Sequence, residues 1–127
     1  MITEDYVSFE VAKLLKEKGF DIYVSSFYDV EGEFNRKEAD WNWNIGSRYS
    51  APTLQMAMKW LRRVHNLHCA VDYDFVLGWY CQITSLKETV EYDYEEMKHY
   101  HPEKDNGFSS PEEACEEAIK YCLENLI

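Results

Sequence analysis

The chain has 127 residues, 46% of them hydrophobic and 29% charged, which is the composition of a globular protein long enough to bury a core. Acidic residues outnumber basic ones by 24 to 13 and give a net charge of −11, which argues against binding to bare nucleic acid or an anionic membrane. No signal peptide is recognisable, and the four cysteines form no CxxC pair, so we expect reduced thiols in a cytoplasmic protein with one domain over residues 1–127.

The first predicted helix covers residues 9–18. Ser8 precedes it as a suitable N-cap, and Gly19 follows it as a left-handed stop. Residues 21–30 are rich in β-branched and aromatic side chains and are predicted to form a strand. The polar residues 31–40 are predicted to form a loop.

A second strand is predicted over residues 41–45, because Trp41, Trp43 and Ile45 alternate with two asparagines. It would pair with the strand over residues 21–30 in a hairpin with a long loop. The next predicted helix enters at residues 50–53 and runs to about Leu67. Because this helix is apolar over most of its circumference, we expect it to be central to the core or to offer a face to a partner.

Three further strands are predicted over residues 69–75, 77–83 and 89–95, followed by a loop over residues 99–107. The last helix has the clearest start, since Ser110, Pro111 and Glu113 form a capping box with a first-turn proline. The predicted fold class is α+β, with an antiparallel sheet of about four to five strands and three helices packed mainly on one face.

Three stretches carry a resemblance to a known group of proteins: residues 6–20 (YVSFEVAKLLKEKGF), 50–62 (SAPTLQMAMKWLR) and 110–127 (SPEEACEEAIKYCLENLI). They resemble small uncharacterised proteins of Bacteroides and related gut bacteria, many of them carried by prophages or mobile elements. The resemblance covers the three helices, a little over a third of the chain. It implies a cytosolic accessory protein of a phage or mobile element, and it assigns no activity, cofactor or site residue.

The candidate metal ligands are His65, His68 and Cys69, which would share one helical face if the helix continued to that point. His99, His101 or Cys81 could complete a tetrahedral zinc site. The alternative is that His65 belongs to the core, His68 caps the helix and Cys69 begins an inward-facing strand. We favour this alternative because the paired Cys/His spacing of zinc sites is absent, and we expect no cofactor.

A thiol enzyme is a second hypothesis, since any cysteine could pair with a histidine in space. Cys81, Cys115 and Cys122, however, lie on predicted core faces, where a thiol is inert. No phosphate loop, serine elbow or zinc-protease helix is present, so we do not expect an enzyme.

The aromatic middle of the chain suggests protein binding. Phe34, Trp41, Trp43 and Tyr49 surround a polar loop, and aromatic residues are enriched at interfaces. The alternation around Trp41 and Trp43 is also what the inner face of a sheet produces, and the pattern favours that interpretation.

An acidic face is predicted on the strand over residues 89–95, where Glu91, Asp93 and Glu95 alternate with apolar residues. Such a stripe could imitate a phosphate backbone and inhibit a nucleic-acid enzyme, or it could simply keep the protein soluble. The leading hypothesis is a small non-enzymatic protein that binds another protein or itself, and acidic mimicry is the alternative.

Overall fold

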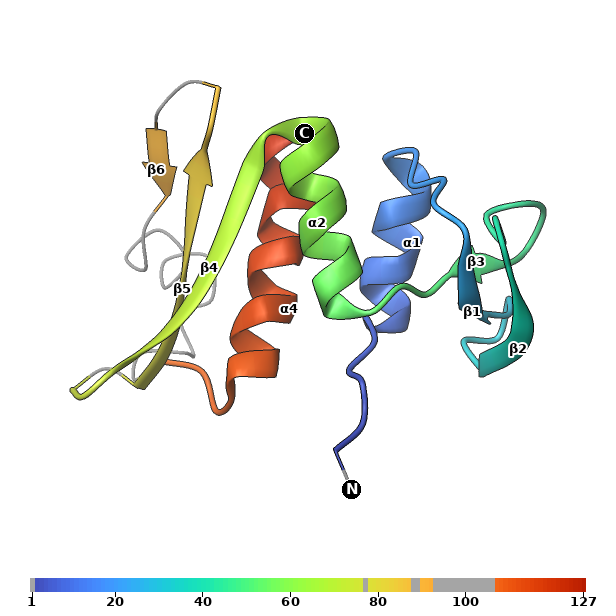
Figure 1. Cartoon of the computed structure of the whole chain (residues 1–127), viewed down its shortest axis with the longest axis horizontal. Helices are drawn as coiled ribbons and strands as arrows, with labels where there is room; N and C mark the ends of the chain where they lie inside the picture. Colours follow the sequence, from blue (N-terminus) through green and yellow to red (C-terminus); the bar gives the residue numbers. More distant parts are fainter. Residues whose placement is uncertain (1, 77, 88–89, 93–106) are drawn as a thin grey trace.

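Two three-stranded antiparallel sheets lie on either side of a layer of helices in the computed structural model, which describes residues 2–76, 78–87, 90–92 and 107–127 (Figure 1). The helical elements are α1 (Phe9–Glu17), α2 (Leu54–His65), α4 (Pro111–Tyr121) and the π-helical turn η2 (Cys122–Leu126). The strands are β1 (Val24–Tyr28), β2 (Phe34–Trp41), β3 (Tyr49–Ser50), β4 (Leu67–Asp74), β5 (Gly78–Ser85) and β6 (Val90–Tyr92). The predicted α+β class is confirmed, and the strands are divided between two sheets, in the orders β2-β1-β3 and β4-β5-β6.

The helices fill the space between the sheets (Figure 1). Helix α4 packs on β4 and β5, α2 packs on β4 and α4, and α1 packs on β3 and α4. One cluster of buried apolar side chains draws on all three helices and both sheets. Leu15 and Leu61 contribute from α1 and α2, and Ile83 and Ile119 contribute from β5 and α4. Burial of these side chains is the main stabilising term of the fold.

All three predicted helices are confirmed, and each begins at a capping side chain. The hydroxyl oxygens of Ser8, Thr53 and Ser110 accept hydrogen bonds from backbone N–H groups in the first turns, at 3.1–3.2 Å. Helix α2 ends earlier than expected, at His65, because Asn66 adopts a left-handed conformation with φ of 58°. That residue turns the chain directly into β4.

The prediction of a loop over residues 31–40 is wrong, because most of this segment forms β2. This strand pairs with β1 across a short turn in which the Asp29 carboxylate accepts from the N–H groups of Glu31 and Glu33, at 2.9 and 3.0 Å. Nearly every side chain of β2 is exposed. A strand that buries neither face has no apolar alternation, and its charged side chains suit the edge of a sheet.

The prediction of a strand over residues 41–45 is also wrong. Trp41 ends β2, and residues 42–48 form a loop that leads to β3. The Asn42 side chain accepts from the N–H of Asn44, and the Asn44 side chain accepts from the N–H of Ser50. Local hydrogen bonds of this kind compete with a sheet ladder and turn the chain. The two tryptophans therefore do not share a sheet face.

The strands predicted over residues 69–75 and 77–83 are confirmed as β4 and β5. They pair in continuous register from Leu67 opposite Ser85 to Asp74 opposite Gly78, and they form a long hairpin (Figure 1). Of the strand predicted over residues 89–95, the structure describes only Val90–Tyr92, which form β6 and pair with β5. Most of the loop predicted over residues 99–107 lies outside the described residues.

Candidate binding surfaces

Trp43 is partly buried and packs against the sheet that contains β1. Its ring stacks on Phe27, with centroids 4.6 Å apart, and its indole N–H donates to the Val24 carbonyl at 2.7 Å. Its backbone N–H donates to the buried Ser50 hydroxyl at 3.0 Å. Trp43 therefore holds the loop after β2 against the sheet, and its role is structural.

Tyr49 is also partly buried, in β3. Its ring meets the edge of Phe9 at 5.6 Å, and the Lys16 ammonium lies 4.8 Å from the ring centroid. Both contacts join β3 to α1, so Tyr49 forms part of the packing between a helix and a sheet.

Trp41 is exposed at the end of β2. Its side chain retains 52% of its accessible surface, and that of its neighbour Tyr23 retains 59%. The two rings contact each other with centroids 5.8 Å apart, and the register of β1 and β2 places Val24 opposite Trp41. Tyr23 and Trp41, here called the aromatic pair, thus present two adjoining rings to solvent.

Phe34 lies at the opposite end of β2. It pairs with Tyr28 of β1, whereas Trp41 pairs with Val24, so the two ends lie about 13 Å apart at the usual rise per residue of β1. Phe34 is partly exposed, and its ring contacts Tyr28 at 5.5 Å and Tyr6 at 4.9 Å. The four aromatic residues predicted to form one surface are therefore separated. Two are structural, and two lie at opposite ends of a strand.

The candidate metal ligands are not brought together. His65 ends α2 and packs against Trp60 with ring centroids 4.7 Å apart, and burial followed by the Lys18 charge lowers its pKa. His68 is exposed on β4, and Cys69 is buried on the other face, as consecutive strand residues must be. Within the described part of the chain, no three His, Cys, Asp or Glu side chains are grouped to hold a metal ion.

All four cysteines are buried free thiols, as predicted for Cys69, Cys81, Cys115 and Cys122. The Cys69 and Cys122 sulfurs lie 3.8 Å apart, and this contact, together with burial, raises the pKa of Cys69. Burial is the main cause that raises the pKa of Cys81 and of Cys115 to about 12. Such thiols are protonated at neutral pH and are poor nucleophiles.

We expect a soluble thiol reagent to label the folded protein very slowly at neutral pH. Raising a thiol pKa from 9.0 to about 12 lowers the thiolate population about a thousandfold, and burial also blocks access. Mass spectrometry after timed labelling, with the urea-unfolded chain as control, would measure this difference. Rapid labelling of one cysteine in the folded protein would contradict the buried arrangement.

The predicted acidic face lies largely outside the structure. Glu91 belongs to β6, but its side chain is not described, and Asp93 and Glu95 lie outside the described residues. Acidic mimicry therefore stays a sequence-based hypothesis.

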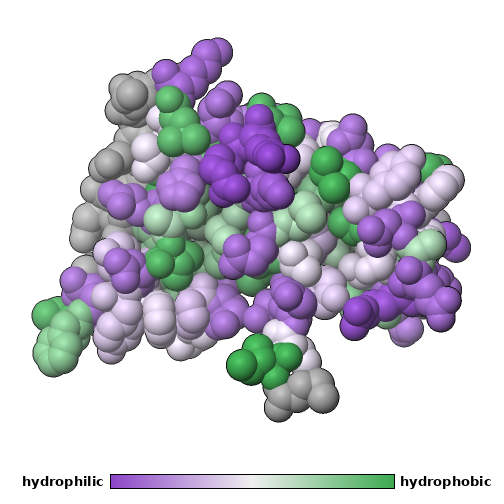
Figure 2. Space-filling view, viewed as in Figure 1, coloured by the Kyte–Doolittle hydropathy of each residue, from purple (hydrophilic) through white to green (hydrophobic). Residues whose placement is uncertain are grey.

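The tip of the β4–β5 hairpin is an apolar surface that the sequence analysis did not single out. Phe75 and Val76 retain 96% and 85% of their accessible surface, and Tyr73 beside them is exposed. Figure 2 shows apolar atoms at this projecting end of the molecule. The signal in the sequence was an aromatic and a β-branched residue next to each other at a turn, between Asp74 and Gly78.

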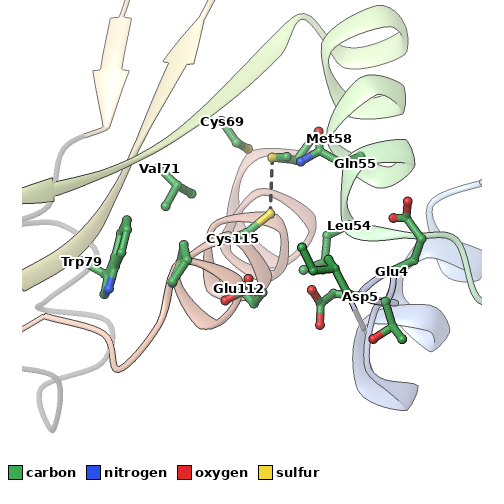
Figure 3. Close-up of a pocket in the computed structure, with 13 residues that line it drawn as sticks. Glu4, Asp5, Leu54, Gln55, Met58, Cys69, Val71, Trp79, Glu112 and Cys115 are labelled. Carbon is green, nitrogen blue, oxygen red and sulfur yellow. Dashed lines mark hydrogen bonds between the residues drawn. The ribbon is translucent and has the colours of Figure 1, made fainter.

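A pocket of about 540 Å³ opens where the N-terminal segment, α2, α4 and the β4–β5 sheet meet (Figure 3). Met58, Cys69 and Cys115 point towards one another at one end, and the Cys115 thiol lies 3.3 Å from the Met58 sulfur. Trp79 lines the opposite side, and Glu112 lies between them in the view. No sequence pattern predicted this pocket, because four distant segments build it.

A second, smaller pocket of about 390 Å³ adjoins the first along α2. It shares Gln55, Met58 and Cys69 with the larger pocket, but Lys59 and Arg62 give it a basic lining. The two faces of α2 beside the sheet thus differ in charge.

No family model, curated protein or solved structure matches the chain. Among the described residues, every helix is too short or too polar to cross a membrane. Function must therefore be argued from the surfaces themselves.

Proposed function

We propose that the chain is a small non-enzymatic protein that binds a protein partner through the aromatic pair, Tyr23 and Trp41. The observation that carries this proposal is that two large rings touch each other while more than half of each is exposed. Aromatic residues of this kind supply most of the energy of many interfaces. The accessory role in a prophage or mobile element that the sequence resemblance implies is part of the same proposal.

The aromatic pair is a better contact than the hairpin tip because it is held in place before binding. Trp41 pairs with Val24 of β1, next to an irregularity in the β1–β2 ladder, and its ring contacts Tyr23. Phe75 and Val76 lie in the turn between β4 and β5, and among the described residues no other ring contacts Phe75. A preorganised contact loses less conformational entropy and binds more tightly for the same area.

The Trp41→Ala variant is expected to keep its fold and lose its partner. Because Trp41 is exposed, its removal should change the free energy of unfolding by less than about 1 kcal/mol. Capture of the partner from a Bacteroides lysate, quantified by mass spectrometry, should fall about tenfold or more. Sedimentation at increasing protein concentration would show whether the partner is a second copy of the chain.

Phe75→Ala is the matched control, since it also removes an exposed ring but from the other sheet. It should capture the same protein as the wild type. Equal capture by the wild type and Trp41→Ala would overturn the proposed contact. Loss of capture with Phe75→Ala alone would assign the contact to the hairpin tip.

A further inference from the structure

The larger pocket combines an apolar interior with a negatively charged rim. Leu54, Val71 and Met58 line the interior, and Trp79 forms one wall. Three carboxylate residues line the same pocket: Glu4, Asp5 and Glu112. Among the described residues that line it there is no lysine, arginine or histidine. The pocket therefore favours positive charge at its rim and apolar groups within.

We propose that this pocket binds a hydrophobic organic cation, meaning an ammonium or guanidinium group carried on an aromatic or branched alkyl body. The volume of about 540 Å³ lies in the range of small-molecule sites. The apolar body would contact Leu54, Val71 and Met58, and the cation would meet the rim carboxylates. The Trp79 ring offers a further surface for a cation. This inference does not depend on the proposed contact at Tyr23 and Trp41.

A second copy of the chain is a poorer occupant on grounds of charge. Phe75 and Val76, the exposed apolar residues at the tip of the β4–β5 hairpin, are flanked by Asp74 and lie close to Asp72. Inserting that tip would place these carboxylates against an acidic rim, between two chains that each carry a net charge of −11. Like charges brought together in this way oppose association. A small cation is instead attracted by the carboxylates of the rim.

The 2-phenylethylammonium ion is a suitable probe, with 2-phenylethanol as a neutral analogue of nearly the same shape. Titration calorimetry should give a Kd of about 1 mM for the cation, as expected for about nine non-hydrogen atoms. The neutral analogue should bind about tenfold more weakly. In nitrogen–proton spectra the Trp79 indole signal, assigned with Trp79→Phe, should shift with the same saturation curve.

The charge of the rim is tested with Asp5→Asn and Glu112→Gln combined, after circular dichroism confirms the fold. Removing two carboxylates near the cation should weaken its binding about tenfold or more and reduce the salt dependence of binding. Glu38→Gln combined with Asp40→Asn is the matched control, because it removes the same number of exposed carboxylates from β2, in the other sheet. This control should bind the cation as the wild type does.

Three results would overturn the proposal. The first is the absence of saturable binding of 2-phenylethylammonium at millimolar concentration. The second is equal affinity for the cation and the alcohol, since a rim of carboxylates would then play no part. The third is equal weakening by the control variant with Glu38→Gln and Asp40→Asn and by the rim variant, which would show only general attraction to an acidic protein.

Discussion

Replacement of Trp43 with Ala is expected to lower the free energy of unfolding by about 3 kcal/mol. The variant would lose the stacking on Phe27, 4.6 Å between centroids, and the 2.7 Å hydrogen bond from the indole to the Val24 carbonyl. The Val24 carbonyl would lose its partner in a partly buried position, which adds to the cost. Urea unfolding followed by circular dichroism would measure the change.

Trp43→Phe separates the two contributions. It keeps a ring against Phe27 and loses only the indole donor, so it should cost about 1 kcal/mol. If Trp43→Ala were as stable as Trp41→Ala, the assignment of Trp43 to the structure and Trp41 to the surface would be wrong. The pair of tryptophans, two residues apart, is thus a direct test of the arrangement after β2.

Alkaline pH is expected to destabilise the fold steeply from about pH 9 upwards. The pKa values of Cys81 and Cys115 are raised to about 12 in the folded chain, above their ordinary value of 9.0. Below pH 9 both states keep these protons, so stability does not change. Between pH 9 and 12 the unfolded chain releases protons that the folded chain retains, and each thiol removes about 1.4 kcal/mol of stability per pH unit.

Cys81→Ala should make this fall in stability shallower by about 1.4 kcal/mol per pH unit, because one titrating group is removed. Ile83→Val is the matched control: Ile83 is buried in the same strand, and the change destabilises the core by about 1 kcal/mol without altering a thiol. Its stability should have the same pH dependence as the wild type. Urea unfolding at intervals from about pH 8 to pH 11 would distinguish the variants. Identical slopes for wild type and Cys81→Ala would contradict the buried, protonated state of Cys81.

The helices could be predicted from sequence because their signals are local. A capping hydroxyl at Ser8, Thr53 or Ser110 acts within three or four residues of the helix that it starts. The cysteines were also predicted to be buried, since they repeat at the spacing of apolar residues in their elements. Both inferences use local patterns, which a single sequence contains.

Strand β2 and the loop after it could not be predicted in the same way. The side chains of β2 are mostly exposed on both faces, so only backbone pairing with β1 identifies the strand. Trp43 follows an alternating pattern, but its contacts with Phe27 and Val24 lie 16 and 19 residues away in the chain. Non-local contacts of this kind decide which aromatic side chain is buried, and no local pattern reveals them.

The binding surfaces were only partly predictable for the same reason. Trp41 was a candidate from the sequence, but its exposed partner Tyr23 comes from the segment before β1. The acidic pocket joins residues near the N-terminus to α4, more than 100 positions later, which no sequence pattern connects.

Hydrogen–deuterium exchange of the chain, alone and with its captured partner, is the most direct test of the proposed contact. The account predicts that binding slows exchange in the peptides around Tyr23 and Trp41, while the hairpin tip at Phe75 exchanges equally fast in both states. Unchanged exchange around Tyr23 and Trp41, together with protection at Phe75, would contradict it.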